Sequence, residues 1–389
     1  MRKGWEYKKL GEVCEVVTGT TPKTNIPEYW GKGHYWVTPA ELNDTTVYID
    51  KTERQITDEA LSKTKLRLLP VGTVLLSSRA PIGKVAIANA EMYCNQGFKN
   101  CICSEAIYNK YLFYFLRLKK DYLNSLGRGA TFKEISKSIV KSIKIPLPPL
   151  STQLAIVSEL DKINELIRLK KEQLKDFDNL AQSLFYEMFG DPVENEKGWE
   201  VKKLNEIVSD NCSISYGIVQ PGDGVENGVP VVRPVDMTKT FVSRKGLKNT
   251  TKEISDSYKR TILKGNEILM CVRGTTGLIS MATPELQGCN VTRGIAPIEC
   301  GPTCDKWFIF YQILNPAIQH HIAEYTRGIA LKQINMKDVR DIPLCLPPLS
   351  LQRLFAQRIE QIEREKSEVQ KSIQDLETLL ASRMQYWFE

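Results

Sequence analysis

Residues that could carry out catalysis or hold a metal ion are scarce in this sequence. Its three histidines are His34, His320 and His321. The last two are adjacent in a predicted helix, where such a pair is more often exposed surface than a proton-transfer site. Two close cysteine pairs, Cys101-x-Cys103 and Cys300-x3-Cys304, lack the spacing of a zinc site. No Gly-x4-Gly-Lys-Ser/Thr phosphate loop is present. We therefore predict no catalytic residue, no metal and no cofactor in this chain.

The charged residues are unevenly distributed. Residues 1–150 contain 23 Lys and Arg against 14 Asp and Glu, whereas residues 190–349 contain 19 against 18. A basic amino-terminal part favours a polyanionic partner such as nucleic acid, although an ordinary solvated surface can carry the same excess. The charge alone leaves both interpretations open.

Neither a membrane segment nor a secretion signal is predicted. No run approaches eighteen apolar residues, and the opening MRKGWEYKKLGEV has no hydrophobic stretch after its basic residues. Ten cysteines without a dense framework fit a reducing compartment better than a disulfide scaffold. We expect a cytoplasmic protein.

The chain repeats itself at a period of nearly two hundred residues. Trp5–Val13 recurs as Trp199–Ile207 with six of nine positions identical, an offset of 194. Three further segments have counterparts at slightly different offsets: Gly72–Arg79 matches Gly265–Arg273, Cys94-Asn95 matches Cys289-Asn290, and Pro148–Gln153 matches Pro347–Gln352. Loop insertions produce such drifts, so we infer a tandem duplication.

Each repeat begins with a mixed α+β module. Short β-rich runs such as Val71–Leu76 and Val85–Ala88 are bounded by Gly and Pro and are followed by an aromatic-rich helical stretch, residues 108–126 or 305–325. The first module ends at the proline-rich Ile145–Leu150, after which Ser151 can cap a helix.

A long helix closes each repeat. Residues 151–188 lack Pro and Gly, and apolar residues recur at spacings of three and four from Leu160 through Ile163 and Ile167 to Met188, with Lys170 as a polar interruption. Residues 359–387 repeat this register, with Lys366 interrupting at a different place. The pattern predicts an antiparallel coiled coil of two equivalent units related by a pseudo-two-fold axis. Two unrelated surface helices remain the alternative.

These patterns divide the chain into four predicted parts: modules at 1–150 and 190–349, and spacer helices at 151–189 and 350–389. About 37 residues of helix measure about 55 Å, which exceeds one DNA turn of about 34–36 Å. We expect such helices to hold the modules apart for two separated half-sites.

The order of motifs resembles the specificity subunit of type I restriction-modification systems. The resemblance covers essentially the whole chain, and the following motifs of the first module carry it: Thr18-Gly19-Thr20-Thr21-Pro22, Glu28-Tyr29-Trp30-Gly31, Trp36-Val37-Thr38-Pro39-Ala40, Gly72–Gly83, Asn95-Gln96-Gly97, Gly129-Ala130-Thr131-Phe132 and Ile145–Leu150. The second module departs from this pattern, because Gln-Gly is missing after Asn290 and the opening loop is Ser215–Gln220.

The resemblance implies a non-catalytic subunit with two target-recognition domains that binds double-stranded DNA. It implies two methyltransferase subunits as partners, with or without restriction subunits. Together they would recognise a bipartite, asymmetric site and methylate adenine. An adenine methyltransferase needs an Asn/Asp-Pro-Pro-aromatic element, and the two Pro-Pro pairs here, in Leu147–Leu150 and Leu346–Leu349, do not fit it.

Arg, Lys, Asn and Gln side chains can read base edges, and Ser, Thr and basic side chains can bind phosphates. On this basis the predicted DNA contacts of the first module are Thr20, Thr21, Lys23, Arg79, Lys84, Asn95, Gln96, Lys99, Arg128 and Lys133. Those of the second module are Gln220, Arg233, Arg273, Thr275, Thr276, Asn290, Arg293, Arg327 and Lys332. Each has a purely structural alternative, such as a loop cap or a link to the helices.

Two other functions stay open at this point. The chain could be an interaction scaffold whose coiled coil is its purpose, in which case binding to duplex DNA should be absent. It could also be an enzyme of unfamiliar type. A DNA affinity that falls steeply with salt would favour the DNA-binding interpretation.

Overall fold

The computed structural model describes residues 5–389 except 80, 130–132, 223 and 330. The chain forms two compact units: the first comprises residues up to Lys171 together with Lys371–Glu389, and the second comprises Glu172–Gln370. The long helices α6 (Leu150–Phe189) and α12 (Leu349–Phe388) each contribute to both units. Within the described ranges, no helix is both long enough and apolar enough to cross a membrane.

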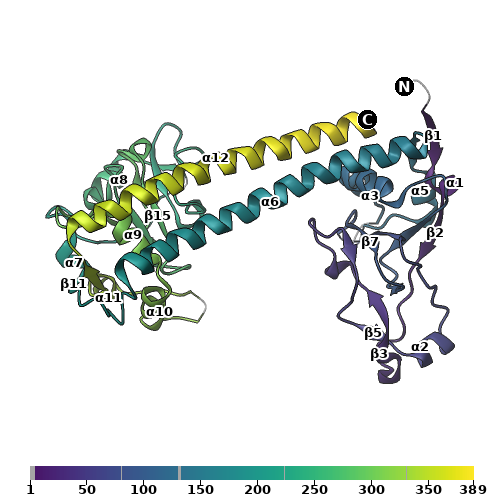
Figure 1. Cartoon of the computed structure of the whole chain (residues 1–389), viewed down its shortest axis with the longest axis horizontal. Helices are drawn as coiled ribbons and strands as arrows, with labels where there is room; N and C mark the ends of the chain where they lie inside the picture. The colour runs from purple at the N-terminus through teal and green to yellow at the C-terminus, as the bar shows by residue number, and fades with distance from the viewer. Residues whose placement is uncertain (1–4, 80, 130–132, 223, 330) are drawn as a thin grey trace. The chain divides into compact units, whose positions relative to one another are not determined.

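The first unit is built around a five-stranded sheet with helix α3 against it (Figure 1). The order of this sheet is β2 (Cys14–Thr18), β9 (Lys99–Cys103), β6 (Val74–Leu76), β7 (Val85–Ala88) and β4 (Tyr48–Ile49). A three-stranded sheet consists of β5 (Gln55–Ile56), β3 (Trp30–Val37) and β8 (Tyr93–Cys94), and β1 (Glu6–Lys9) pairs with β10 (Lys144–Leu147). The helices are α1 (Leu10–Val13), α2 (Asp58–Lys63), α3 (Asn109–Leu118), α4 (Lys120–Ser125) and α5 (Lys137–Ser142).

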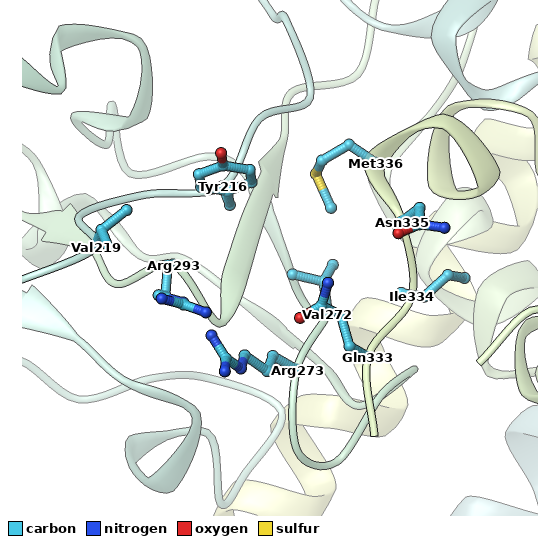
Figure 2. A pocket seen from close by; sticks show the side chains of 9 residues that line it. All are labelled: Tyr216, Val219, Val272, Arg273, Arg293, Gln333, Ile334, Asn335 and Met336. Atoms are coloured by element: carbon cyan, nitrogen blue, oxygen red, sulfur yellow. The ribbon is translucent and has the colours of Figure 1, made fainter. Parts of the chain in front are cut away.

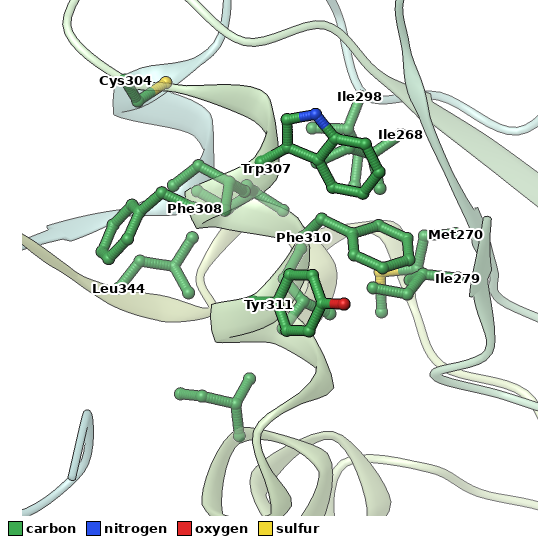
Figure 3. Packing of buried hydrophobic residues seen from close by; sticks show 14 of the residues in the cluster. Ile268, Met270, Ile279, Ile298, Cys304, Trp307, Phe308, Phe310, Tyr311 and Leu344 are labelled. Atoms are coloured by element: carbon green, nitrogen blue, oxygen red, sulfur yellow. The ribbon is translucent and has the colours of Figure 1, made fainter. Parts of the chain in front are cut away.

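The second unit has a similar plan with shorter sheets. Strand β14 (Ile268–Cys271) lies between β15 (Ile279–Met281) and β17 (Ile295–Ile298), β12 (Val229–Val232) lies between β13 (Lys248–Thr250) and β16 (Asn290–Val291), and β11 (Glu200–Lys203) pairs with β18 (Pro343–Leu346). The helices are α7 (Leu204–Ile207), α8 (Lys252–Ser257), α9 (Lys306–Leu314), α10 (Pro316–Glu324) and α11 (Met336–Arg340). Figure 3 shows the aromatic side chains of α9 packed with aliphatic residues of β14 and β15 in the core of this unit.

The strand registers of the two units correspond residue by residue. Glu6 pairs with Leu147 in the first unit, and Glu200 pairs with Leu346 in the second, at offsets of 194 and 199. These are the offsets that the sequence repeat predicts at its two ends. The repeat is therefore a structural one, in which α1 and α7 follow equivalent strands.

One predicted correspondence is wrong. Val37 pairs with Cys94, and the equivalent Val232 pairs with Val291 and not with Cys289. Likewise, the Asn95 amide donates to the Val37 carbonyl at 3.2 Å, and the Thr292 amide donates to that of Val232 at 3.0 Å. The chance likeness of Cys94-Asn95 to Cys289-Asn290 shifted the alignment by two residues, because hydrogen-bond register was not visible in the sequence.

The corrected register also explains the apparently missing Gln-Gly. Thr292-Arg293-Gly294 occupies the place of Asn95-Gln96-Gly97. The carbonyl oxygen of Gly97 accepts from the Ser78 amide at 2.7 Å, and that of Gly294 accepts from the Val272 amide at 2.8 Å. The turn is thus present in both units, and it carries Gln96 in one and Arg293 in the other.

Helices α6 and α12 run in opposite directions within each unit. In the first unit, Glu159 of α6 contacts Arg383, and Lys171 contacts Glu377 at 2.8 Å. In the second unit, Asp178 contacts Lys366 at 2.7 Å. The predicted polar interruption at Lys366 is thereby paired, since Glu363 also lies 2.8 Å from its ammonium group. Most of the predicted apolar seam is buried, including Leu160, Ile163, Ile167, Ala181, Ile359, Ile362, Val369 and Ile373.

The helix contact at Glu159 should make stability depend on pH. Its carboxylate accepts from the Arg383 guanidinium and, at 3.0 Å, from Trp387 Nε1. Pairing with Arg383 outweighs partial burial, so the pKa of Glu159 lies below its ordinary value of 4.5. A carboxyl whose pKa is lower in the folded state stabilises the protein above its unfolded pKa, and this contribution disappears as the pH falls through the folded pKa.

We therefore expect Glu159→Gln to lower the melting temperature by about 2–4 °C near neutral pH. The difference from wild type should shrink once the pH falls below 4.5, the ordinary value for glutamate. Thermal unfolding of both proteins across this range measures it, with Glu187→Gln at an exposed position of α6 as a control. A difference that stayed constant with pH would contradict this role of the Glu159 carboxylate.

Candidate nucleic-acid interface

Four of the predicted DNA contacts of the first unit line one pocket. Arg79, Lys84, Asn95 and Gln96 line a pocket of about 380 Å³ together with Thr38, Pro39, Ala40, Pro81 and Gly97. The loop after β2 joins this group, because the Thr21 hydroxyl contacts the Gln96 side chain. The turn around Gly97 brings these residues together, since the Asn95 side chain accepts from the Gly97 amide at 2.9 Å. We name the pocket lined by these nine residues the first-unit pocket; Thr21 contacts it through Gln96.

Two members of the first-unit pocket are also used by the fold. The Lys84 ammonium donates to the Pro39 carbonyl at 3.0 Å. The Arg79 guanidinium donates to Glu134 at 2.8 Å. Glu134 stands beside the predicted contact Lys133 in the sequence but was not itself predicted.

The structure contradicts the prediction that Lys99 contacts DNA. Its side chain is only 6% exposed, and its ammonium group lies 2.9 Å from Glu134 and 3.2 Å from the Ser78 hydroxyl. Burial acts to raise the pKa of Glu134, but Lys99 and Arg79 together lower it below its ordinary value. Lys99 is therefore occupied inside the unit and does not reach a ligand. We name Lys99, Glu134 and Arg79 the Glu134 triad.

The second unit has a larger pocket in the corresponding region. It measures about 410 Å³, and its lining includes two predicted contacts, Arg273 and Arg293. Figure 2 shows the guanidinium groups of these arginines pointing toward one another. The rest of the lining consists of Tyr216, Val219, Val272, Gln333, Ile334, Asn335 and Met336. We name this the second-unit pocket.

Three polar residues of the second-unit pocket are not among the predicted DNA contacts. Tyr216 lies in the opening loop that departs from the first module, and Gln333 and Asn335 follow the predicted contact Lys332. Their proximity to predicted residues was the available signal. Nothing in the sequence indicated that the loop containing Tyr216 meets the segment containing Gln333 and Asn335, because this proximity depends on the tertiary structure.

The structure also contradicts the prediction that Asn290 contacts DNA. It is fully buried, and its side chain bonds to the Thr261 hydroxyl at 2.7 Å and to the Ser255 hydroxyl at 3.0 Å. It therefore fastens β16 to the segment around α8 and is not available to DNA. The misaligned register caused this error, since Thr292 and not Asn290 is equivalent to Asn95.

The other predicted contacts lie outside these two pocket linings. Arg233 is held by its neighbour Asp236 at 2.8 Å, and Thr276 bonds to Thr326 at 3.1 Å. The remaining predicted residues are exposed or half-buried: Thr20, Lys23, Arg128, Lys133, Gln220, Thr275, Arg327 and Lys332. Part of the Gly129–Phe132 motif, residues 130–132, lies outside the described residues.

A metal centre has no support in the described residues. No three His, Cys, Asp or Glu side chains among them are grouped closely enough to hold a metal ion. The polar groups that converge are arginine, amide, hydroxyl and lysine side chains in the two pockets. These donors suit phosphates and base edges.

A family model described as the type I restriction modification DNA specificity domain matches residues 2–176 and again residues 196–378. The chain belongs to this specificity family. The MjaIX specificity subunit of a type I restriction enzyme from Methanocaldococcus jannaschii is 30% identical over 97% of this chain and 91% of its own length. The EcoBI specificity subunit from Escherichia coli is 24% identical over 78% of this chain and 71% of its own length. The resemblance inferred from the motifs is confirmed.

Solved structures share the fold of this type I specificity chain. The S subunit of the type I restriction-modification system from M. genitalium aligns with a TM-score of 0.53 at 14% identity, over 99% of this chain and 96% of that chain. A chain from a structure of type I R-M complex assembly and conformational transition aligns with a TM-score of 0.64 at 21% identity, over 99% and 97%. Two matched domains in one chain agree with the predicted tandem repeat.

Proposed function

We propose that this type I specificity chain reads a bipartite, asymmetric DNA site, one half with each unit, and directs a partner adenine methyltransferase to it. The observation that carries the proposal is that equivalent backbones present different pocket linings. The first-unit pocket carries Asn95 and Gln96, whereas the second-unit pocket carries Arg293. Since base edges and phosphates are bound by different kinds of side chain, unequal linings favour two unequal half-sites.

The partners follow from the family. Two methyltransferase subunits, with or without restriction subunits, would carry out the catalysis, and this chain would determine the DNA sequence at which they act. We further propose that α6 and α12 form one antiparallel coiled coil and that their length sets the number of unread base pairs between the half-sites. The opposite direction of the helices in both units and the burial of the apolar seam support this.

Exchanging residues 1–150 for the corresponding module of another family member should change one half of the methylated sequence and leave the other half intact. The reason is that the first-unit pocket lies wholly within the exchanged residues and the second-unit pocket wholly outside them. Methylated adenines are mapped after mixing the chain with its partner methyltransferase.

The chain without its partner is the control and should transfer no labelled methyl groups to DNA. Methyl transfer by the chain alone would overturn its non-catalytic role. A change in both half-sites would overturn independent reading by the two units. A chain that showed no salt-dependent affinity for duplex DNA would instead favour the interaction scaffold.

A further inference from the structure

The two units contain one structural position at which their charges differ sharply. In the first unit, Glu134 exchanges two backbone hydrogen bonds with Arg128 at 3.0 Å and forms a bridge with Arg79. In the second unit, Gln333 exchanges two with Arg327 at 2.8 Å and forms a bridge with Arg273. Glu134 and Gln333 are thus equivalent, and so are Arg79 and Arg273.

The residue opposite this position differs as well. Ser77 bridges to Phe98, and the equivalent Cys271 pairs with Ile295, so Lys99 of the first unit corresponds to Ala296 of the second. The second unit therefore lacks the carboxylate and the ammonium group of the Glu134 triad and keeps only the arginine. Both residues change together, as expected if the buried Lys99 ammonium needs the Glu134 carboxylate.

Because of these two changes, the arginines of the second unit lack the carboxylate partner that Arg79 has. The Arg79 guanidinium is bound by the Glu134 carboxylate. Within the described residues, no carboxylate lies within ion-pair distance of Arg273 or Arg293, although the two guanidinium groups point toward one another (Figure 2). Two converging cations repel each other, and an anion between them converts this repulsion into attraction.

The chemistry of the second-unit pocket fits one particular anion. A phosphate diester has a single negative charge and can accept bidentate hydrogen bonds from guanidinium groups. Tyr216, Gln333 and Asn335 add neutral donors around the arginines. A base edge is uncharged and would leave the repulsion of the arginines in place, so the geometry favours phosphate over guanine.

We propose, building on the proposed DNA-binding function, that Arg273 and Arg293 clamp one DNA backbone phosphate and that Glu134 withholds the equivalent Arg79 from DNA. The second unit then gains affinity from a contact that the first unit does not make. The first-unit pocket presents the uncharged Asn95 and Gln96 at this place, and its Lys84 donates to the Pro39 carbonyl. Of the two clamp positions, the first unit has an arginine only at Arg79, because Gln96 occupies the place of Arg293, and Glu134 binds this arginine.

The double variant Lys99→Ala/Glu134→Gln tests the withheld arginine. At these two positions it gives the first unit the residues of the second, Ala296 and Gln333. It removes one charge of each sign and leaves no unpaired buried charge. Binding of the full chain to a duplex that carries the mapped site is measured against salt concentration. We expect about tenfold tighter binding at low salt, with the slope of log affinity against log salt steeper by about 0.9, the value for one added phosphate contact. The control is Glu15→Gln/Arg67→Ala, which removes an exposed ion pair of the same unit.

The variant Gln333→Glu tests the clamp itself, because it places a carboxylate beside Arg273. We expect about tenfold weaker binding and a slope shallower by about 0.9. Gln287→Glu is the control, since Gln287 is exposed in the same unit and does not line the pocket. Single methylphosphonate substitutions are scanned along the duplex, and one position should be found at which the difference between wild type and Gln333→Glu disappears.

The outcomes separate this inference from the proposed function. Wild-type chain that binds DNA in a salt-dependent manner, with both variants equal to their controls, would overturn the clamp alone. Loss of selectivity at a single base pair in Arg273→Ala, without a uniform loss of affinity, would show base reading and would also overturn it. Wild-type chain without DNA affinity would overturn the proposed function and the inference together.

Discussion

Replacing Phe185 with alanine should lower the free energy of unfolding by about 3–5 kcal/mol. Its ring is 2% exposed and lies 5.1, 5.8 and 5.7 Å from the rings of Phe189, Phe308 and Phe355. These partners belong to α6, α9 and α12, so the substitution opens a cavity where three helices of the second unit meet. Urea unfolding followed by circular dichroism measures the loss.

Tyr186 provides the matched control because it is the next residue of α6 and is 38% exposed. We expect Tyr186→Ala to cost less than about 1 kcal/mol. Equal losses for the two variants would mean that the aromatic cluster does not hold the three helices together.

Replacing Gln352 with leucine should be almost as damaging, although the change is conservative in size. Gln352 is fully buried at the start of α12. Its side chain accepts from the Asp305 amide at 2.9 Å and donates to the carbonyls of Pro347 at 2.8 Å and Thr303 at 3.4 Å. Leucine fills the space but leaves buried backbone groups without partners, so we expect a loss of about 3 kcal/mol.

The first unit repeats this arrangement and allows an internal test. Gln153 accepts from the Tyr108 amide at 2.9 Å and donates to the carbonyls of Ala106 at 3.0 Å and Pro148 at 2.9 Å. Gln153→Leu should lower stability by a similar amount. Gln361→Leu on an exposed position of α12 is the control and should cost little. Stability that was unchanged in both buried variants would refute the bonding role of these glutamines.

The features predicted correctly are those that local pattern determines. The period of the apolar residues in α6 and α12 and the proline-rich stops before them are visible in the sequence. The helices begin at Leu150 and Leu349, so Ser151, which was expected to cap the first of them, lies within α6. The repeated Pro-Pro-Leu-Ser-x-Gln segment was also visible, but the burial of Gln153 and Gln352 was not. That burial depends on segments that are distant along the chain, such as Tyr108 and Asp305.

The site was harder to predict because residue type does not reveal what a side chain contacts. Lys99 and Arg273 are both basic residues near strands, yet one is buried against Glu134 and the other lines a pocket. Asn290 was chosen through a two-residue error in strand register, which only the pairing of β12 with β16 corrects. Tyr216 and Gln333 become neighbours of the arginines through tertiary contacts alone.

The division of the long helices between the units has a consequence for biosynthesis. The second unit is one continuous stretch, Glu172–Gln370, whereas the first needs Lys371–Glu389 to complete it. Phe388 belongs to the core of the first unit and lies 5.0 Å from the Tyr111 ring. On a translating ribosome, the amino-terminal unit is therefore made first but finishes folding last. Until Phe388 emerges, part of its apolar core stays uncovered, and this is the interval in which the nascent chain most needs protection from aggregation.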